Sequence, residues 1–189
     1  MSQSENQILI NAIDNAAASM NMMLGSEVKV SNINFSFKEE NDIVQYSKKI
    51  EKGAHVLKTD MMGNLVSTSY LVMSPTDVNK IFEKCLPGEA LKTNNSGNLA
   101  IQGGFLLELD NIVAAGAITV FANQLDETIY GDVPKLLIMN KLNINEYIDA
   151  EIIEKGFNNC INAVVHVENI DIELDFIWLF DDNFFKLLV

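Results

Sequence analysis

Glu108 and Asn111 are the residues whose types and spacing most directly suggest chemistry. On an α-helix, residues three positions apart lie on one side, so both head groups can reach the same external point. A carboxylate can pair with a cation, whereas a carboxamide donates and accepts hydrogen bonds without changing its protonation state. A Glu-x-x-Asn pair also occurs on the solvated edge of ordinary helices, so by itself it does not define a site.

The segment from about 104 to 125 must position this pair, and its pattern predicts a helix that packs on a core. Apolar side chains lie on other parts of its surface and can be buried: Leu107, Ile112, Ala115, Ile118 and Phe121. Pro134 follows Asn111 after 22 residues and begins a predicted strand. Proline fixes φ and removes one backbone donor, so we expect it to shape the junction beneath the helix without taking part in chemistry.

The rest of the chain alternates helical and strand patterns. Besides 104–125, helices are predicted over 5–24, 75–86 and 181–189. Strands are predicted over 27–37, 42–50, 54–61, 63–73, 128–131, 134–142, 159–169 and 170–180. In 27–37 the apolar residues change side midway, which indicates a bulge. The segment 87–98 has the composition of a linker, and 143–156 has no firm assignment.

The order helix, antiparallel strands, helix occurs twice, which predicts an α+β fold made of two equivalent halves, about 1–95 and 96–189. The two long helices support this duplication. Residues 12–25 and 108–121, offset by 96 positions, share an opening of the form x-aliphatic-Asp-Asn followed by small residues.

The pattern Glu108-x-x-Asn111-x22-Pro134 resembles the active-site signature of the CheC/CheX/FliY family of chemotaxis phosphatases. The stretch ELDNIVAAGAITVFANQL is similar to that family's catalytic helix, in which Glu-x-Gly-Asn precedes small residues. Residues 12–25 look like the equivalent first helix. The resemblance implies a single CheC-like domain over 1–189, with long helices packed on a largely antiparallel sheet and two pseudo-symmetric halves.

The chain departs from the family pattern at several positions. Gly104 stands where the family usually has Ser or Asp, and Asp110 stands where it often has glycine. We expect Gly104 to serve as the helix N-cap, a position that glycine tolerates. In the first helix, Ala12 and Asn15 occupy the places of the Glu and the Asn. We therefore expect a degenerate first site and one working site, in the second half.

The resemblance implies an aspartyl-phosphate phosphatase acting on a CheY-like response-regulator receiver domain. Asn111 would orient the attacking water, and Glu108 would pair with the receiver's active-site lysine. The protein would need no cofactor of its own, because the receiver supplies Mg²⁺. The alternative is a non-catalytic interaction module of the same fold that binds a receiver domain or a CheD-type deamidase.

Composition excludes several other classes of function. The formal net charge is −13, which argues against nucleic-acid binding and against docking on anionic lipid. The longest apolar runs are about half a membrane span, and the amino terminus has no signal-peptide pattern, so we expect a cytoplasmic protein. Cys85 and Cys160 lie far apart and are expected to be reduced. His55 and His166 are isolated, and we expect no metal site.

Overall fold

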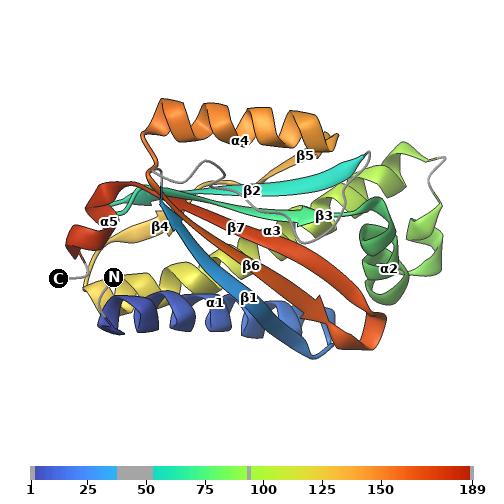
Figure 1. The fold of residues 1–189 in the computed structure, drawn as a ribbon. Coiled ribbons are helices and arrows are strands. Elements are labelled where there is room, and N and C mark those ends of the chain that lie inside the picture. The colour runs from blue at the N-terminus through green and yellow to red at the C-terminus, as the bar shows by residue number, and fades with distance from the viewer. Residues whose placement is uncertain (1–2, 38–52, 93–94, 188–189) are drawn as a thin grey trace.

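The computed structural model describes residues 3–37, 53–92 and 95–187, and the predicted strand over 42–50 lies outside them. The described chain is α+β, with helices on both faces of an antiparallel sheet (Figure 1). The helices are α1 (Gln3–Leu24), α2 (Pro75–Cys85), α3 (Ser96–Leu125), α4 (Lys141–Lys155) and α5 (Asp182–Leu187). The strands are β1 (Val28–Phe37), β2 (Ala54–Gly63), β3 (Ser67–Met73), β4 (Ile129–Gly131), β5 (Lys135–Met139), β6 (Asn159–Val167) and β7 (Ile172–Phe180).

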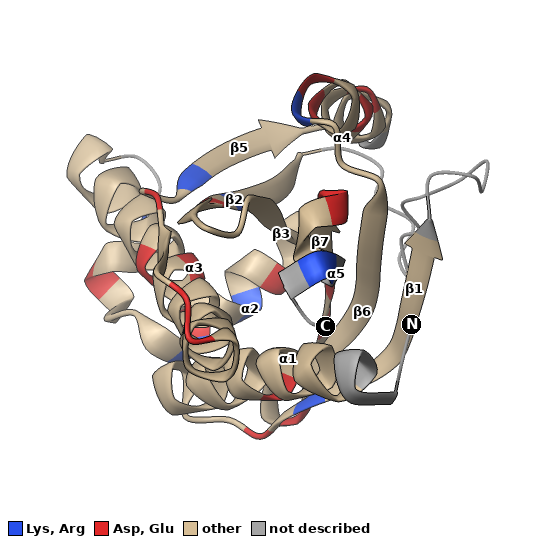
Figure 2. Ribbon diagram, turned by 90° about the vertical axis from the view of Figure 1, so that its left-hand side faces the viewer, with Lys and Arg blue, Asp and Glu red and all other residues tan. Residues whose placement is uncertain are grey.

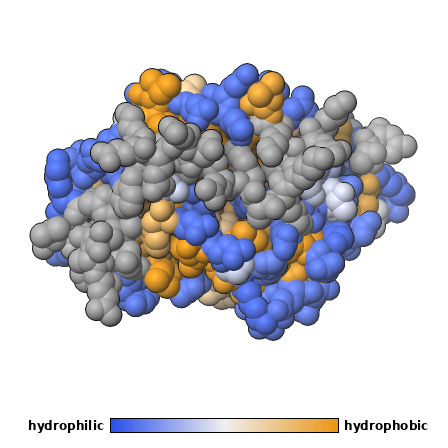
Figure 3. All heavy atoms as spheres, in the orientation of Figure 1, coloured by the Kyte–Doolittle hydropathy of each residue, from blue (hydrophilic) through white to orange (hydrophobic). Residues whose placement is uncertain are grey.

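The sheet is curved, and its two faces carry separate cores. Helices α1 and α3 close the concave face together with α2 and α5, and α4 lies on the outer face (Figure 2). The larger core lies on the concave side and includes an aromatic cluster around Phe121, which contacts Trp178, Phe180 and Phe184. The smaller core joins α4 to the sheet through residues such as Ile144, Ile148 and Tyr70. Figure 3 shows apolar side chains exposed along the edge of the molecule where α4 lies. Leu142 and Ile153 of α4 are 69% and 78% exposed.

The strand order is β1-β6-β7-β3-β2-β4, with β5 also paired to β2. The strands of the first half, β1, β2 and β3, correspond in order to β4 with β5, β6 and β7 of the second half. With this correspondence, the strand order is the same when the sheet is followed from either edge. This is the order that two equivalent halves would give. The bulge predicted in 27–37 is present, since the β1–β6 register shifts between Ser31 and Asn34 and Asn32 has φ 51°.

The start of α3 differs from the prediction. The helix begins at Ser96, where the Asn95 side chain accepts a 2.8 Å hydrogen bond from the Gly97 amide. Part of the predicted linker is therefore helical. The Asn95 cap starts the helix in a polar turn, and the buried residues of the helix begin only at Gln102. Gly104 lies inside this helix and is not its N-cap. The unassigned segment 143–156 forms most of α4, which ends at Gly156 in the left-handed conformation.

Helix α3 is long and apolar enough by length and composition to cross a membrane. Half of its most apolar window is buried within the protein, against α1 and the sheet. A core helix of a folded domain passes the same test, and the burial of Leu109, Val113, Ala117 and Phe121 agrees with that role.

Candidate functional site

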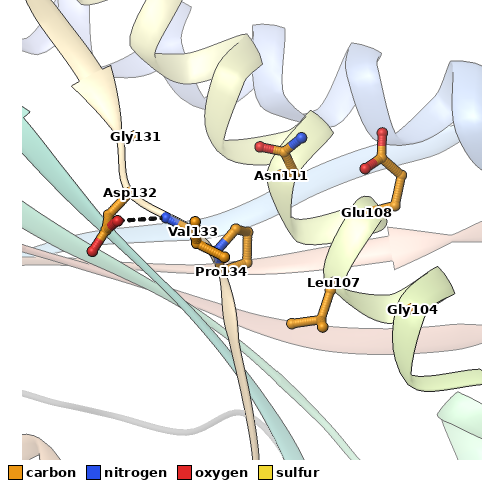
Figure 4. A pocket seen from close by; sticks show the side chains of 8 residues that line it. All are labelled: Gly104, Leu107, Glu108, Asn111, Gly131, Asp132, Val133 and Pro134. Atoms are coloured by element: carbon orange, nitrogen blue, oxygen red, sulfur yellow. Dashed lines mark hydrogen bonds between the residues drawn. The ribbon is translucent and has the colours of Figure 1, made fainter. Parts of the chain in front are cut away.

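Glu108 and Asn111 lie one turn apart on the outer side of α3, and both side chains are exposed. Together with Gly104, Leu107 and the loop after β4, they line an open hollow of about 480 Å³ (Figure 4). The two head groups leave the helix on the same side, and Asn111 extends toward the loop. The predicted pair is thus neither turned inward nor splayed to different sides.

The burial of neighbouring residues explains why this pair faces outward. Leu109 and Val113 are 0% and 2% exposed and pack in the larger core, which determines the side of α3 that faces the sheet. Helical periodicity then places 108 and 111 on the solvent side. Ala115, one turn beyond Asn111, continues the same side and is exposed, contrary to the predicted burial. Among the described residues, no hydrogen bond or ion pair engages either head group.

The second wall of the hollow is the loop between β4 and β5, and Pro134 stands at its end, directly before β5. The Asp132 amide donates a 2.7 Å hydrogen bond to the Asp60 carbonyl of β2, and the Val133 amide donates to the Asp132 side chain at 2.8 Å. Val133 is 76% exposed at the rim. Pro134 thus lies at a loop-to-strand junction and lines the same hollow as Glu108 and Asn111.

Asp110, between the two predicted site residues, points into the protein. It is 2% exposed and accepts a 2.7 Å hydrogen bond from the Thr59 hydroxyl of β2. Burial raises the pKa of the Asp110 carboxyl to about 7, although the bond from Thr59 opposes the rise. Burying an ionised carboxylate is unfavourable, which is the cause of this shift. The sequence marked Asp110 as a departure from the family pattern but gave no sign of its partner.

Gly104 lines the hollow from a position in the interior of α3. A Cβ atom built there would meet no heavy atom within 4 Å. The protein's own packing therefore does not require glycine at this position, whereas at Gly116 a Cβ would lie 2.4 Å from the Ser19 Oγ.

The predicted degenerate first site is arranged differently from the second. Ala12 is 0% exposed, and the Asn15 amide donates a 2.6 Å hydrogen bond to the Gly116 carbonyl of α3. The burial patterns of α1 and α3 agree best at an offset of 97, one more than the sequence comparison gave: Leu9 matches Leu106, Ala12 matches Leu109 and Ala16 matches Val113. At this offset the counterparts of Glu108 and Asn111 are Asn11 and Asp14. The first helix therefore lacks the Glu–Asn pair in either alignment.

Ionisable groups elsewhere form two further clusters that the sequence did not predict. On the outer face of the sheet, the Lys58 ammonium lies 2.6 Å from Glu151 of α4, and that of Lys155 lies 2.6 Å from Asp60. Burial alone would lower the pKa of Lys58, but Glu151 and Asp60 raise it above its ordinary value. This network fastens α4 to the sheet. It lies opposite the hollow, because Thr59, between Lys58 and Asp60, faces α3.

The second cluster surrounds His166, whose ring nitrogens lie 3.1 Å from the Ser31 hydroxyl and 3.2 Å from the Glu173 carboxylate. The three side chains come from β1, β6 and β7, on neighbouring strands. Within the described ranges, no group of three or more His, Cys, Asp or Glu side chains is arranged to hold a metal ion. Cys85 and Cys160 are both free, with Cys85 partly buried and Cys160 buried.

No protein-family model matches the chain, and no curated protein matches it. Solved structures match along nearly its whole length. FliY of Thermotoga maritima has a TM-score of 0.65 at 15% identity, covering 100% of this chain and 95% of FliY. A CheC-like protein of Shewanella sp. PV-4 has a TM-score of 0.57 at 14% identity, covering 96% and 99%.

CheX of Borrelia burgdorferi, solved in complex with CheY, BeF₃ and Mg²⁺, has a TM-score of 0.65 at 11% identity, covering 92% of this chain and 97% of CheX. The chain thus has the fold of the CheC, CheX and FliY chemotaxis proteins, as the sequence resemblance predicted. At these identities the likeness concerns the fold, and the function must be argued from the site.

Proposed function

We propose that this protein is a phosphatase that hydrolyses the aspartyl phosphate of a CheY-like receiver domain. The observation that carries the proposal is the placement of Glu108 and Asn111, exposed on one side of α3 and beside Pro134 in one hollow. Two further facts support it: the motif resembles the family's signature, and a CheX of the same fold has been solved in complex with CheY, BeF₃ and Mg²⁺.

In the proposed reaction a water molecule attacks the phosphorus in line with the acyl-phosphate bond. The P–O bond to the receiver's aspartate breaks, and the products are a free carboxylate and inorganic phosphate. An acyl phosphate already has a good leaving group, so the main requirement is to hold the water in position. The Asn111 carboxamide suits this task, because it accepts and donates hydrogen bonds without needing to ionise.

Glu108 would anchor the complex by pairing with the receiver's active-site lysine, one turn along the helix from the water. The receiver would supply the Mg²⁺ that neutralises the phosphoryl oxygens. Both residues stand on a helix whose opposite side is held in the larger core, so little backbone ordering remains to be done on binding. Leu107 and the exposed Val133 at the rim offer apolar contact area around the polar pair.

The test is phosphate release from a ³²P-labelled receiver, measured above the receiver's own autodephosphorylation. We expect Asn111→Ala to reduce kcat at least a hundredfold, since it removes the group that holds the water. Glu108→Ala should chiefly raise KM. Asn123→Ala, an exposed Asn near the other end of α3, and Glu154→Ala, an exposed Glu on α4, are matched controls that should behave as wild type.

Equal rates for wild type, Asn111→Ala and Glu108→Ala would refute the catalytic assignment. A non-catalytic module remains the alternative, and it would bind a BeF₃-activated receiver or a CheD-type deamidase without shortening the lifetime of the phosphate. The first helix, with Asn11 and Asp14 at the corresponding positions, already fits a role limited to packing and binding.

A further inference from the structure

Two consecutive residues of β2 contact both walls of the hollow. The Thr59 hydroxyl donates to Asp110 of α3, on the helix that carries Glu108 and Asn111. The next residue, Asp60, accepts the Asp132 amide through its carbonyl and so holds the loop that leads to Pro134. The relative position of the two walls is therefore set through one short segment of β2.

The hydrogen bond to Asp110 is one that core packing does not require. Leu109 and Val113 beside it already bury apolar side chains, and an apolar residue at 110 would avoid the cost of placing a carboxyl group in the core. A hydrogen bond restrains orientation more than apolar packing does, because its strength depends on the angle between donor and acceptor. A 2.7 Å bond at residue 110 restrains rotation of α3 at the turn that spans residues 108 and 111.

We propose that Thr59 and Asp110 are positioning residues of the candidate site, which orient Asn111 toward the partner through the hydrogen bond between β2 and α3. This inference rests on the proposed phosphatase function. Neither residue touches the substrate, so the expected effect is on kcat, through the placement of the attacking water, and not on the docking of the receiver.

The ionisation of Asp110 predicts how kcat depends on pH, which gives a further test of the positioning role. Its pKa responds to burial and to Thr59, in opposite directions. Lys58 and the Asp60 carboxylate face α4, on the other side of the sheet. Other ionisable groups on α3 and on the elements packed against it include Asp14, His55, Glu89, Glu108, Tyr130, Asp132 and Lys135. Of these, Lys135 lies 3.8 Å from the Asp60 carboxylate. The ionised carboxylate accepts the Thr59 hydroxyl more strongly than the neutral acid does. We therefore expect kcat to rise with pH through about 7, and Asp110→Asn to remove this inflection.

The experiment compares Thr59→Val, which removes the donor at nearly constant volume, with Thr59→Ser, which restores it. Thr68→Val is the matched control, because the buried Thr68 hydroxyl also donates to an aspartate at 2.7 Å, in this case Asp60 on the opposite face. We expect Thr59→Val to lower kcat about tenfold with KM within twofold of wild type. Thr59→Ser should recover most of the rate, and Thr68→Val should leave kcat unchanged.

A second measurement follows the NMR resonances of the Asn111 side-chain amide in the protein alone, without a receiver domain. These resonances should move with pH near 7 in wild type, stay fixed in Asp110→Asn, and shift in Thr59→Val but not in Thr68→Val. If these shifts occur but wild type releases no phosphate, the proposed function fails while the positioning of Asn111 stands. If Thr59→Val and Thr68→Val are alike in kcat and in the Asn111 resonances, the positioning role is overturned.

Discussion

The side-chain amide of Asn15 donates a 2.6 Å hydrogen bond to the backbone carbonyl of Gly116, which joins α1 to α3 where the two helices cross. The carboxamide of the first helix is thus directed at the second helix, whereas Asn111 on the second helix is directed at solvent. Ser19 and Gly116, which correspond at the offset of 97, meet at the same crossing. The two helices therefore share a packing pattern but differ in the chemistry that they expose.

The first prediction concerns this crossing. Gly116→Ala would place a Cβ 2.4 Å from the Ser19 Oγ and 2.9 Å from the Asn15 carbonyl oxygen, so backbone as well as side chain would have to move. Overpacking of this kind costs about 1–3 kcal/mol, and we expect at least 2 kcal/mol here. Urea denaturation measures the change. Unaltered stability of Gly116→Ala would show that the helices do not approach as closely as described.

The second prediction concerns Gly104. A Cβ there meets nothing within 4 Å, and glycine in a helix interior is less favourable than alanine by about 0.5–1 kcal/mol. Gly104→Ala should therefore stabilise the protein by about that amount. Gly103→Ala is the matched control, since its Cβ meets only the Leu136 Cδ2, at 3.9 Å, and it should give a similar gain. A loss of stability in Gly104→Ala alone would contradict the helical placement of that residue.

The third prediction concerns the pH dependence of stability. Burial raises the pKa of Asp110 from 3.8 to about 7, so between these values the native state keeps a proton that the unfolded state has lost. The contribution of Asp110 to the free energy of unfolding is therefore complete below about pH 4, falls as the pH rises and levels off above about pH 7. The fall is roughly 4 kcal/mol for a shift of this size.

Asp110→Asn cannot ionise, so the difference in unfolding free energy between wild type and this variant should follow that curve. Guanidinium denaturation at pH 5, 6, 7 and 8 measures it. A difference that stays constant over this range would mean that Asp110 has an ordinary pKa. Other carboxylates change stability too, but they are common to both proteins and cancel in the comparison.

The fourth prediction concerns the network under α4. Lys58 is 3% exposed and its ammonium lies 2.6 Å from Glu151. Glu151→Leu leaves a buried lysine short of its nearest counter-charge and should cost about 3–5 kcal/mol. The double variant Lys58→Met/Glu151→Leu should recover much of this loss, because apolar side chains replace the pair. Thermal or urea unfolding tests it, and equal losses in the single and double variants would rule out the pairing.

The sequence alone determined most of the elements and the side of the helix that Glu108 and Asn111 share. The helix caps, the hydrophobic periods and the Glu108-x-x-Asn111 spacing depend on residues within a turn or two, so they can be read locally. The strands β6 and β7, the bulge in β1 and the helix that begins at Pro75 all follow from such patterns. The predicted start of α3, at about 104, was wrong. The helix begins at Ser96 because Asn95 caps it, although the composition of this segment is typical of linkers.

Tertiary structure decided what surrounds the pair. Thr59 and Asp110 are far apart in the chain, and their hydrogen bond exists because β2 passes beneath α3. The same strand also holds the loop before Pro134. The correspondence between α1 and α3 is likewise given by which residues are buried, at an offset of 97, and not by the shared residue types that suggested 96. Contacts of this kind depend on how elements pack, and a sequence pattern records the face that an element buries but not the partner that covers it.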